Sequence, residues 1–131
     1  MLLIERNDTP IGTVTLDADA DPMYWGPEDA PEAALYAHRM VTAHAARGLS
    51  LGAAMLDWAG ERAQAAGRMF VRLDAWRTNM RLREYYADQG FELVRVVDDP
   101  RTGSGACFQR PAHVRLNQGP VTLHEERTKA A

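Results

Sequence analysis

The chain lacks most of the features that mark secreted, membrane-spanning or nucleic-acid-binding proteins. Its 131 residues contain a single cysteine, Cys107, so no disulfide can form within the chain. No apolar run approaches the roughly 20 residues of a membrane-spanning helix, and the first residues show no basic segment followed by a signal-like apolar run. Lys and Arg number 15 against 18 Asp and Glu, which leaves no basic excess for nucleic acid or for an anionic membrane. We therefore expect a cytoplasmic protein that binds neither.

The usual glycine-rich fingerprints of nucleotide-binding proteins are missing as well, and the sequence indicates no metal site. What is present is enough apolar material, 46% of the residues, to bury one core of ordinary size. We expect a single domain over residues 1–112. Residues 113–131 have no long hydrophobic pattern, and we expect them to form a C-terminal tail that is partly disordered.

Hydrophobic periodicity and turn residues predict an α/β (α+β) chain. Two helices are expected, one that begins after Gly48 and ends at Gly67, and one over residues 79–89 that ends at Gly90. Residues 17–32 are rich in proline and acidic side chains, and they form either a solvated loop or the rim of a site. Strands are expected over residues 2–4, 11–16, 33–42, 69–75, 91–97 and 106–110.

The start of the first expected helix has an unusual composition, because Arg47, Gly48, Ser50 and Gly52 stand within six positions of one another. The first turn of a helix leaves backbone N–H groups unpaired and carries partial positive charge. Small residues there allow a phosphate to approach those groups, with Arg47 or Ser50 as additional donors. A tight turn without a ligand is the alternative interpretation of the same residues.

These residues and their surroundings resemble the GNAT superfamily of acyl-CoA-dependent N-acyltransferases. The family's diphosphate loop has the pattern Arg/Gln-x-x-Gly-x-Gly/Ala, and Arg47, Ser50 and Gly52 occupy the matching positions, with serine in place of the usual first glycine. HRMVT resembles the strand before that loop, RLDAWRTN the strand after the helix, and REYYADQGFELV the helix that ends in Tyr-x-x-x-Gly-Phe. The resemblance covers residues 35–97. It implies a mixed, mostly antiparallel sheet that is splayed where the cofactor inserts and is flanked by helices.

The resemblance also implies acetyl-CoA as co-substrate and assigns residues that would hold it. Backbone groups of Met40, Val41 and Thr42 would line the pantetheine arm, and Asn79 would bond to the pantetheine or to nearby backbone. Tyr86 would contact the cofactor at the thioester and protonate the departing thiolate as a general acid. An aromatic residue that packs the helix onto the sheet is the alternative for Tyr86. Main-chain N–H groups of one segment would bind the diphosphate: Arg47, Gly48, Leu49, Ser50, Leu51, Gly52 and Ala53.

The general base that takes a proton from the amine is assigned less directly. His38 stands on the strand beside the expected acetyl site and is one candidate. The alternatives for the base are a carboxylate or ordered water, and in that case His38 is merely structural. Glu32 and the acidic loop before it could attract a cationic amine. Cys107 is not expected to be a nucleophile, because transfer in the family is direct and nothing near it in sequence would activate a thiolate. Trp25, Trp58 and Trp76 are expected to be packing residues. For Trp25, a place in the wall of the acceptor pocket is the alternative.

We predict an N-acetyltransferase in which a primary amine of a small molecule or peptide attacks acetyl-CoA directly. The alternative is a non-catalytic acyl-CoA-binding or interaction domain of the same fold, and a protein-interaction module without CoA is the least favoured. The family usually carries a strand and one or two helices before the hairpin that begins here at Leu2, and this sequence lacks them. Either these elements are lost, or the acceptor site is open, or a second subunit completes it. A homodimer through a sheet edge at residues 2–4 or 107–109 is therefore a further expectation.

Overall fold

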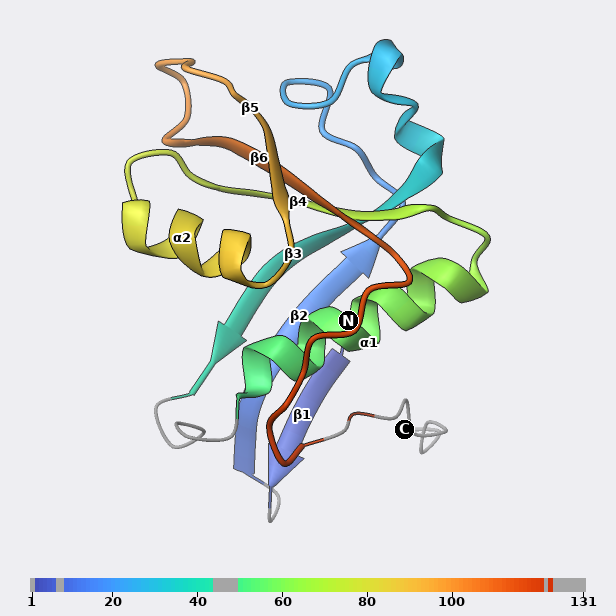
Figure 1. The fold of residues 1–131 in the computed structure, drawn as a ribbon. Coiled ribbons are helices and arrows are strands. Elements are labelled where there is room, and N and C mark those ends of the chain that lie inside the picture. The colour runs from blue at the N-terminus through green and yellow to red at the C-terminus, as the bar shows by residue number, and fades with distance from the viewer. Residues whose placement is uncertain (1, 7–8, 44–49, 122, 124–131) are drawn as a thin grey trace.

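Six strands form one mixed sheet in the computed structural model, which describes residues 2–6, 9–43, 50–121 and 123. The strand order is β1-β2-β3-β4-β6-β5 (Figure 1). Of the pairs in these described ranges, four are antiparallel and one, β3 with β4, is parallel. The predicted α/β fold with a mixed, mostly antiparallel sheet is confirmed. The strands are β1 (Leu2–Arg6), β2 (Thr9–Asp17), β3 (Ala34–Thr42), β4 (Phe70–Trp76), β5 (Glu92–Val96) and β6 (Ser104–Pro111).

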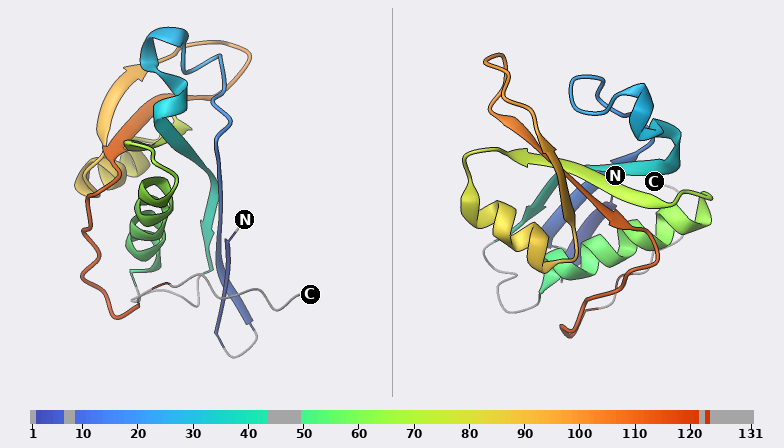
Figure 2. Two further views of the ribbon diagram at one scale, coloured as in Figure 1. Left: turned by 90° about the vertical axis from the view of Figure 1, so that its right-hand side faces the viewer. Right: turned by 45° about the horizontal axis from the view of Figure 1, so that its top comes forward.

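Both α-helices cover the same face of the sheet (Figures 1 and 2). They are α1 (Leu51–Ala65), which follows β3, and α2 (Met80–Asp88), which follows β4, and their buried side chains belong to one core cluster. Gly67 and Gly90 come just after the two helices with φ of 73° and 83°. This left-handed conformation ends helices and favours glycine, so the predicted helix stops are confirmed.

Residues 18–33 cover the opposite face of the sheet. They contain two short 3-10 helices, η1 (Pro27–Asp29) and η2 (Pro31–Ala33), and the turn before them brings Tyr24 and Trp25 into a second buried cluster. This face therefore has a small core of its own, separate from the core beneath α1 and α2.

A buried arginine anchors this segment. Arg72 of β4 is only 4% exposed, and its guanidinium donates to the main-chain oxygens of Asp29 and Ala30 and to the hydroxyl of Tyr36. The same guanidinium lies 4.9 Å from the centroid of the Trp25 ring, within the range of a cation–π contact. The segment that composition predicted as a loop is thus held by internal hydrogen bonds, which a freely solvated loop would not have.

Helix α1 is buried on two sides. The 3.6-residue spacing of apolar residues in the sequence predicts one apolar stripe, which contains Met55 and Ala66. Met55 is buried, but Trp58 and Gly60, outside that stripe, are buried too. Ala66, expected in the stripe, is exposed. The second side of α1 is buried by the chain after β6, which runs back along the helix. It lies so close that a Cβ on Gly60 would be 2.6 Å from the carbonyl oxygen of Ala112.

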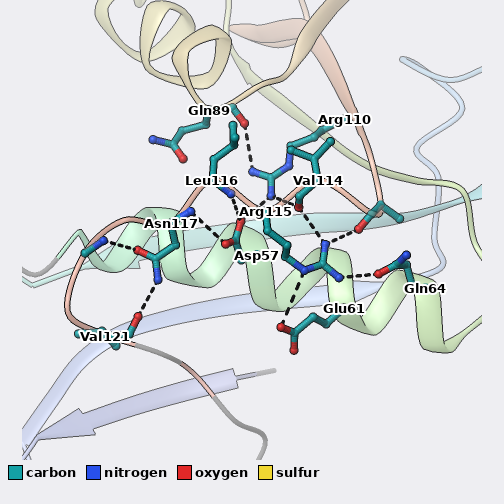
Figure 3. A network of polar contacts seen from close by, with 12 residues as sticks. Asp57, Glu61, Gln64, Gln89, Arg110, Val114, Arg115, Leu116, Asn117 and Val121 are labelled. Carbon is teal, nitrogen blue, oxygen red and sulfur yellow. Dashed lines mark hydrogen bonds and ion pairs between the residues drawn. The ribbon is translucent and has the colours of Figure 1, made fainter.

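Asp57 ties this returning segment to α1 (Figure 3). Nη2 of Arg110 donates to Oδ1 of Asp57 at 2.6 Å. The backbone N–H groups of Leu116 and Asn117 donate to the same carboxylate at 3.1 and 3.0 Å. Part of the expected tail, residues 113–121, therefore lies along the helix with defined partners, while the domain boundary at residue 112 stays a prediction.

The two outermost strands of the sheet are β1 and β5. Residues 107–109 belong to β6, which is paired on one side with β4 and on the other with β5. The expectation of a free edge at these residues is therefore wrong, whereas residues 2–4 do lie in an outermost strand. The homodimer itself stays a prediction. Within the described ranges, no helix is long and apolar enough to cross a membrane.

Candidate active site

Strands β3 and β4 separate partway along their length. They share three residue pairs, the last of them Tyr36↔Arg72. Further along β3, Arg39 adopts a left-handed φ of 52°, and the register with β2 shifts between Thr13 and Thr15. This is the geometry of a β-bulge, which bends a strand. Beyond their last pair the two strands enclose a cavity of about 420 Å³, so the splayed sheet that the resemblance implied is confirmed.

The cavity is lined by β3 and β4, by α2 and by the start of β6. Three residues expected at the site from sequence lie in its wall: His38, Met40 and Tyr86. Asp74 and Ser104, for which the sequence indicated no role, join them. The full set is Ala37, His38, Arg39, Met40, Leu73, Asp74, Ala75, Trp76, Leu82, Tyr86 and Ser104.

Tyr86 combines a packed ring with a place in the cavity wall. Its side chain is 7% exposed, and ring centroids of Tyr85, Phe91 and Phe108 lie 5.5, 5.7 and 5.7 Å from its own. Burial is the main cause that raises the pKa of Tyr86 to about 12, with smaller contributions from Tyr85 and Asp74. The phenol is therefore protonated at neutral pH and can donate a hydrogen bond. Its role as a general acid stays a prediction.

His38 pairs with a carboxylate that the sequence analysis did not single out. Nε2 of His38 lies 3.1 Å from Oδ1 of Asp17. The two side chains share a face because Asp17 pairs with Tyr36, and Thr15 with His38, across β2 and β3. A carboxylate at one ring nitrogen orients the imidazole and leaves the other nitrogen available as a proton acceptor.

Asp74 is a second carboxylate at the cavity. The hydroxyl of Ser104, 30 residues further along the chain, donates a short hydrogen bond to its Oδ2. Within the described ranges no hydrogen bond reaches Oδ1, so this oxygen can accept from a ligand. Because side chains alternate along a strand, Asp74 faces away from Leu73, but nothing in the sequence spacing indicates that Ser104 would meet it.

The start of α1 offers main-chain N–H groups to an anion. Ser50 is the N-cap with φ 53° and ψ 41°, and its side chain makes no capping hydrogen bond. In the part of the chain that the structure describes, the N–H groups of Leu51, Gly52 and Ala53 have no partner, as first-turn groups commonly do not. Groups of this kind commonly bind phosphate, and the binding of a diphosphate here stays a prediction. The remaining loop residues of the prediction lie outside the described residues: Arg47, Gly48 and Leu49.

The other residues expected at the cofactor lie at the ends of β3 and β4. Met40 lines the cavity, and Val41 and Thr42 continue β3 with exposed side chains. Beyond the last shared pair, no described residue of β4 pairs with β3, and backbone contact with a pantetheine arm stays a prediction. Asn79 is the N-cap of α2, where its side-chain oxygen accepts from the N–H of Leu82 at 3.0 Å. Its amide NH2 group stays available, and its contact with a cofactor stays a prediction.

Several further residues weighed in the sequence can now be placed. Cys107 is fully buried, and burial raises the pKa of its thiol to about 11, which disfavours a thiolate. Trp25 and Trp58 are buried in the two clusters and pack, as expected. Trp76 departs from that expectation, because it is 56% exposed and lines the cavity. Glu32 belongs to η2 and is absent from the described cavity wall.

Comparison with known families and structures agrees with this geometry. A family model described as an acetyltransferase (GNAT) domain matches residues 1–93. Comparison with curated protein sequences finds no match.

Solved structures of acetyltransferases share the fold. An acetyltransferase of the GNAT family from Listeria monocytogenes 4b F2365 is 22% identical, with a TM-score of 0.65 over 83% of this chain and 62% of that one. Aminoglycoside 6'-acetyltransferase type Ii is 14% identical, with a TM-score of 0.64 over 87% of this chain and 69% of that one. Nourseothricin acetyltransferase is 20% identical, with a TM-score of 0.61 over 81% of this chain and 60% of that one. The chain thus spans less than two thirds of the length of the first and third of these proteins.

Proposed function

The chain belongs to the GNAT acetyltransferase family, and on that premise we propose that it is an N-acetyltransferase. It would move an acetyl group from acetyl-CoA to a primary amine of a small molecule or peptide by direct attack. The observation that carries the proposal is the cavity between β3 and β4, whose wall contains a protonated phenol, Tyr86, and two proton acceptors, His38 and Asp74. Bound acetyl-CoA would supply the acetyl thioester, and the N–H groups at the start of α1 would hold its diphosphate.

Tyr86 would hold the proton that the departing sulfur takes up. Its pKa of about 12 lies above the value of about 8.5 for a free thiol, and this difference alone disfavours transfer. The hydrogen bond from Tyr86 nevertheless strengthens as negative charge builds on sulfur, and this stabilises the departing thiolate.

Two groups could take the proton that the amine loses before attack. His38, oriented by Asp17, is the base expected from the sequence, and Asp74 is the carboxylate that the structure adds. His38→Gln and Asp74→Asn each remove a proton acceptor and keep a side chain of similar size. The base is the residue whose replacement lowers kcat by roughly 10²-fold or more while leaving CoA affinity unchanged.

A titration with CoA followed by an assay of acetyl transfer tests the proposal. CoA at ~100 times its Kd should stabilise the fold by about 2.7 kcal/mol, and pantetheine, which lacks the diphosphate, should bind more weakly. With acetyl-CoA, at least one amine of a broad panel should become acetylated as free thiol appears. Binding without transfer to any amine would favour the non-catalytic acyl-CoA-binding domain. A protein that CoA does not stabilise would contradict both functions.

A further inference from the structure

The cavity opens onto two chemically different faces of the sheet. Successive side chains of a strand point to opposite faces, and Leu73 and Ala75 belong to the core beneath α1 and α2. Asp74 and Trp76 therefore lie on the other face of β4. Arg72, which is anchored to the segment with η1 and η2, shares that face. A ligand that reaches Asp74 and Trp76 thus approaches from the side away from both helices.

Asp74 is the one acidic residue among those that line the described cavity. It keeps one carboxylate oxygen free for a ligand, and Asp17, outside the cavity wall, lies on the same face and contacts His38. The guanidinium of Arg72 is occupied by main-chain oxygens and side chains. Arg39 lines the cavity from β3, across from Asp74. A cation in the cavity is therefore drawn to the β4 wall, where the carboxylate is.

Trp76 presents an aromatic surface at the same wall. A Cβ on Gly103 would lie 1.9 Å from Cζ2 of the indole, so the ring rests directly on the backbone of the turn before β6. Arg77 fixes that turn, because its N–H donates to the carbonyl oxygen of Gly103 and its guanidinium to that of Ser104, each at 3.0 Å. The indole is thus supported on one side and 56% exposed overall.

From this arrangement we infer that Trp76 determines which acceptor the enzyme takes, and that the acceptor is a cationic primary amine carried on a flat apolar group. Its ammonium lies beside the carboxylate of Asp74, where it can later give up a proton, and its apolar group stacks on the indole. Ammonium groups are attracted both by carboxylates and by the face of an indole. An acceptor with its own carboxylate next to the amine is repelled by Asp74. This inference rests on the proposed function and adds the class of acceptor to it.

Calorimetric titration in the presence of saturating CoA tests the inference with three probes that share one ring. They are 2-phenylethylamine, its neutral analogue 2-phenylethanol, and phenylalanine, which adds a carboxylate. The wild type should bind the amine at least about 10-fold more tightly than either analogue. Trp76→Leu should weaken amine binding roughly 5- to 10-fold, and Trp76→Phe, which keeps an aromatic face, should weaken it less.

Two further variants separate the indole from general effects on the fold. Gly103→Ala keeps Trp76 but forces the indole to move, because the new methyl group would overlap it, and it should weaken amine binding as Trp76→Leu does. Met80→Leu is the matched control, since Met80 is also 56% exposed but is not part of the cavity wall. It should bind the amine as the wild type does.

The outcomes distinguish this inference from the proposed function. If the wild type binds CoA but does not prefer the amine to the alcohol, the acceptor class is wrong. The assignment of Trp76 is wrong if Trp76→Leu and Gly103→Ala bind the amine with wild-type affinity. Failure of the wild type to bind CoA at all would instead remove the proposed function on which the inference rests.

Discussion

The phenolic oxygen of Tyr85 in α2 rests against the backbone of Gly52 in the first turn of α1, where a Cβ would come within 2.3 Å of it. Gly52 does not adopt a positive φ, so conformational freedom does not explain the glycine. The close approach of the Tyr85 hydroxyl to residue 52 explains the glycine instead. The contact with Tyr85 is therefore one reason for residue 52 to lack a side chain, and the proposed function would add a second, the access of a diphosphate to the N–H groups nearby.

Gly52→Ala should consequently reduce stability. A methyl group at residue 52 must displace Tyr85, whose ring is half-buried and packs against Tyr86 at 5.5 Å between centroids. The cost of such overpacking is about 1–3 kcal/mol, partly offset by the higher helix propensity of alanine. In a Tyr85→Phe background the nearest remaining ring atom lies 3.4 Å from the new Cβ, an ordinary contact. A double-mutant cycle by chemical denaturation should therefore show coupling between the two sites, and simple additivity would contradict the close contact.

Ser50→Gly should increase stability. Ser50 has φ 53° and ψ 41° and makes no capping hydrogen bond with its side chain, so it bears the cost of a left-handed backbone without the usual benefit of a serine cap. Glycine removes that cost of roughly 1–2 kcal/mol, less the extra entropy that it brings to the unfolded chain. We expect a net gain of about 0.5–1 kcal/mol in the free energy of unfolding. Ser50→Ala keeps the Cβ and should give no such gain, so equal effects of the two variants would count against the strain.

Asp57→Ala should lower the free energy of unfolding by more than Gly52→Ala does. Arg110 is 1% exposed and depends on Asp57, at 2.6 Å, for its charged partner (Figure 3). Removing one member of a buried ion pair leaves the other charge uncompensated, which costs about 3–5 kcal/mol. The variant also removes the two hydrogen bonds that the N–H groups of Leu116 and Asn117 make to α1. Glu61→Ala is the control on the same helix, because Glu61 is 58% exposed and lies 3.9 Å from Arg115. Its effect on the denaturation midpoint should correspond to less than about 1 kcal/mol.

The sequence predicted the elements that local patterns determine. Both helices, their glycine stops and the places of the strands along the chain follow from periodicity and turn residues, and the splayed sheet follows from the family resemblance. The diphosphate loop and the role of Tyr86, which rest on the same resemblance, stay predictions. The fold could therefore be assigned before the structure, because its local signals and its family pattern agree.

Contacts between distant segments could not be predicted in the same way. The buried positions of Arg72 and Arg110 depend on main-chain oxygens supplied by other segments, and charged side chains are ordinarily expected at the surface. The short hydrogen bond between Asp74 and Ser104 depends on the pairing of β4 with β6. Trp76 ends β4 on the face away from both helices and is 56% exposed, which the apolar character of tryptophan does not reveal.

Tyr86→Phe should separate catalysis from packing. The ring and its contacts with Phe91 and Phe108 remain, so we expect CoA affinity to be unchanged while turnover falls roughly 10²-fold or more, as for loss of a general acid. The pH dependence gives a second readout. A pKa raised to about 12 keeps Tyr86 protonated at every pH below about 10, the value in the unfolded chain. Loss of this proton therefore cannot produce an alkaline decline in kcat below that pH.

The same raised pKa has a consequence for stability, with a definite sign. The neutral phenol is favoured in the fold, so the stability that this preference contributes is fully present below about pH 10 and is lost as the pH rises through about 12. Tyr86→Phe should flatten this part of the stability curve, although Tyr85, whose pKa burial also raises, will retain a share of it. Tyr85→Phe, on the same helix, should change the alkaline stability without the loss of turnover. If Tyr86→Phe acetylates amines at the wild-type rate while chemistry limits that rate, Tyr86 serves packing alone, and the departing sulfur takes its proton from solvent.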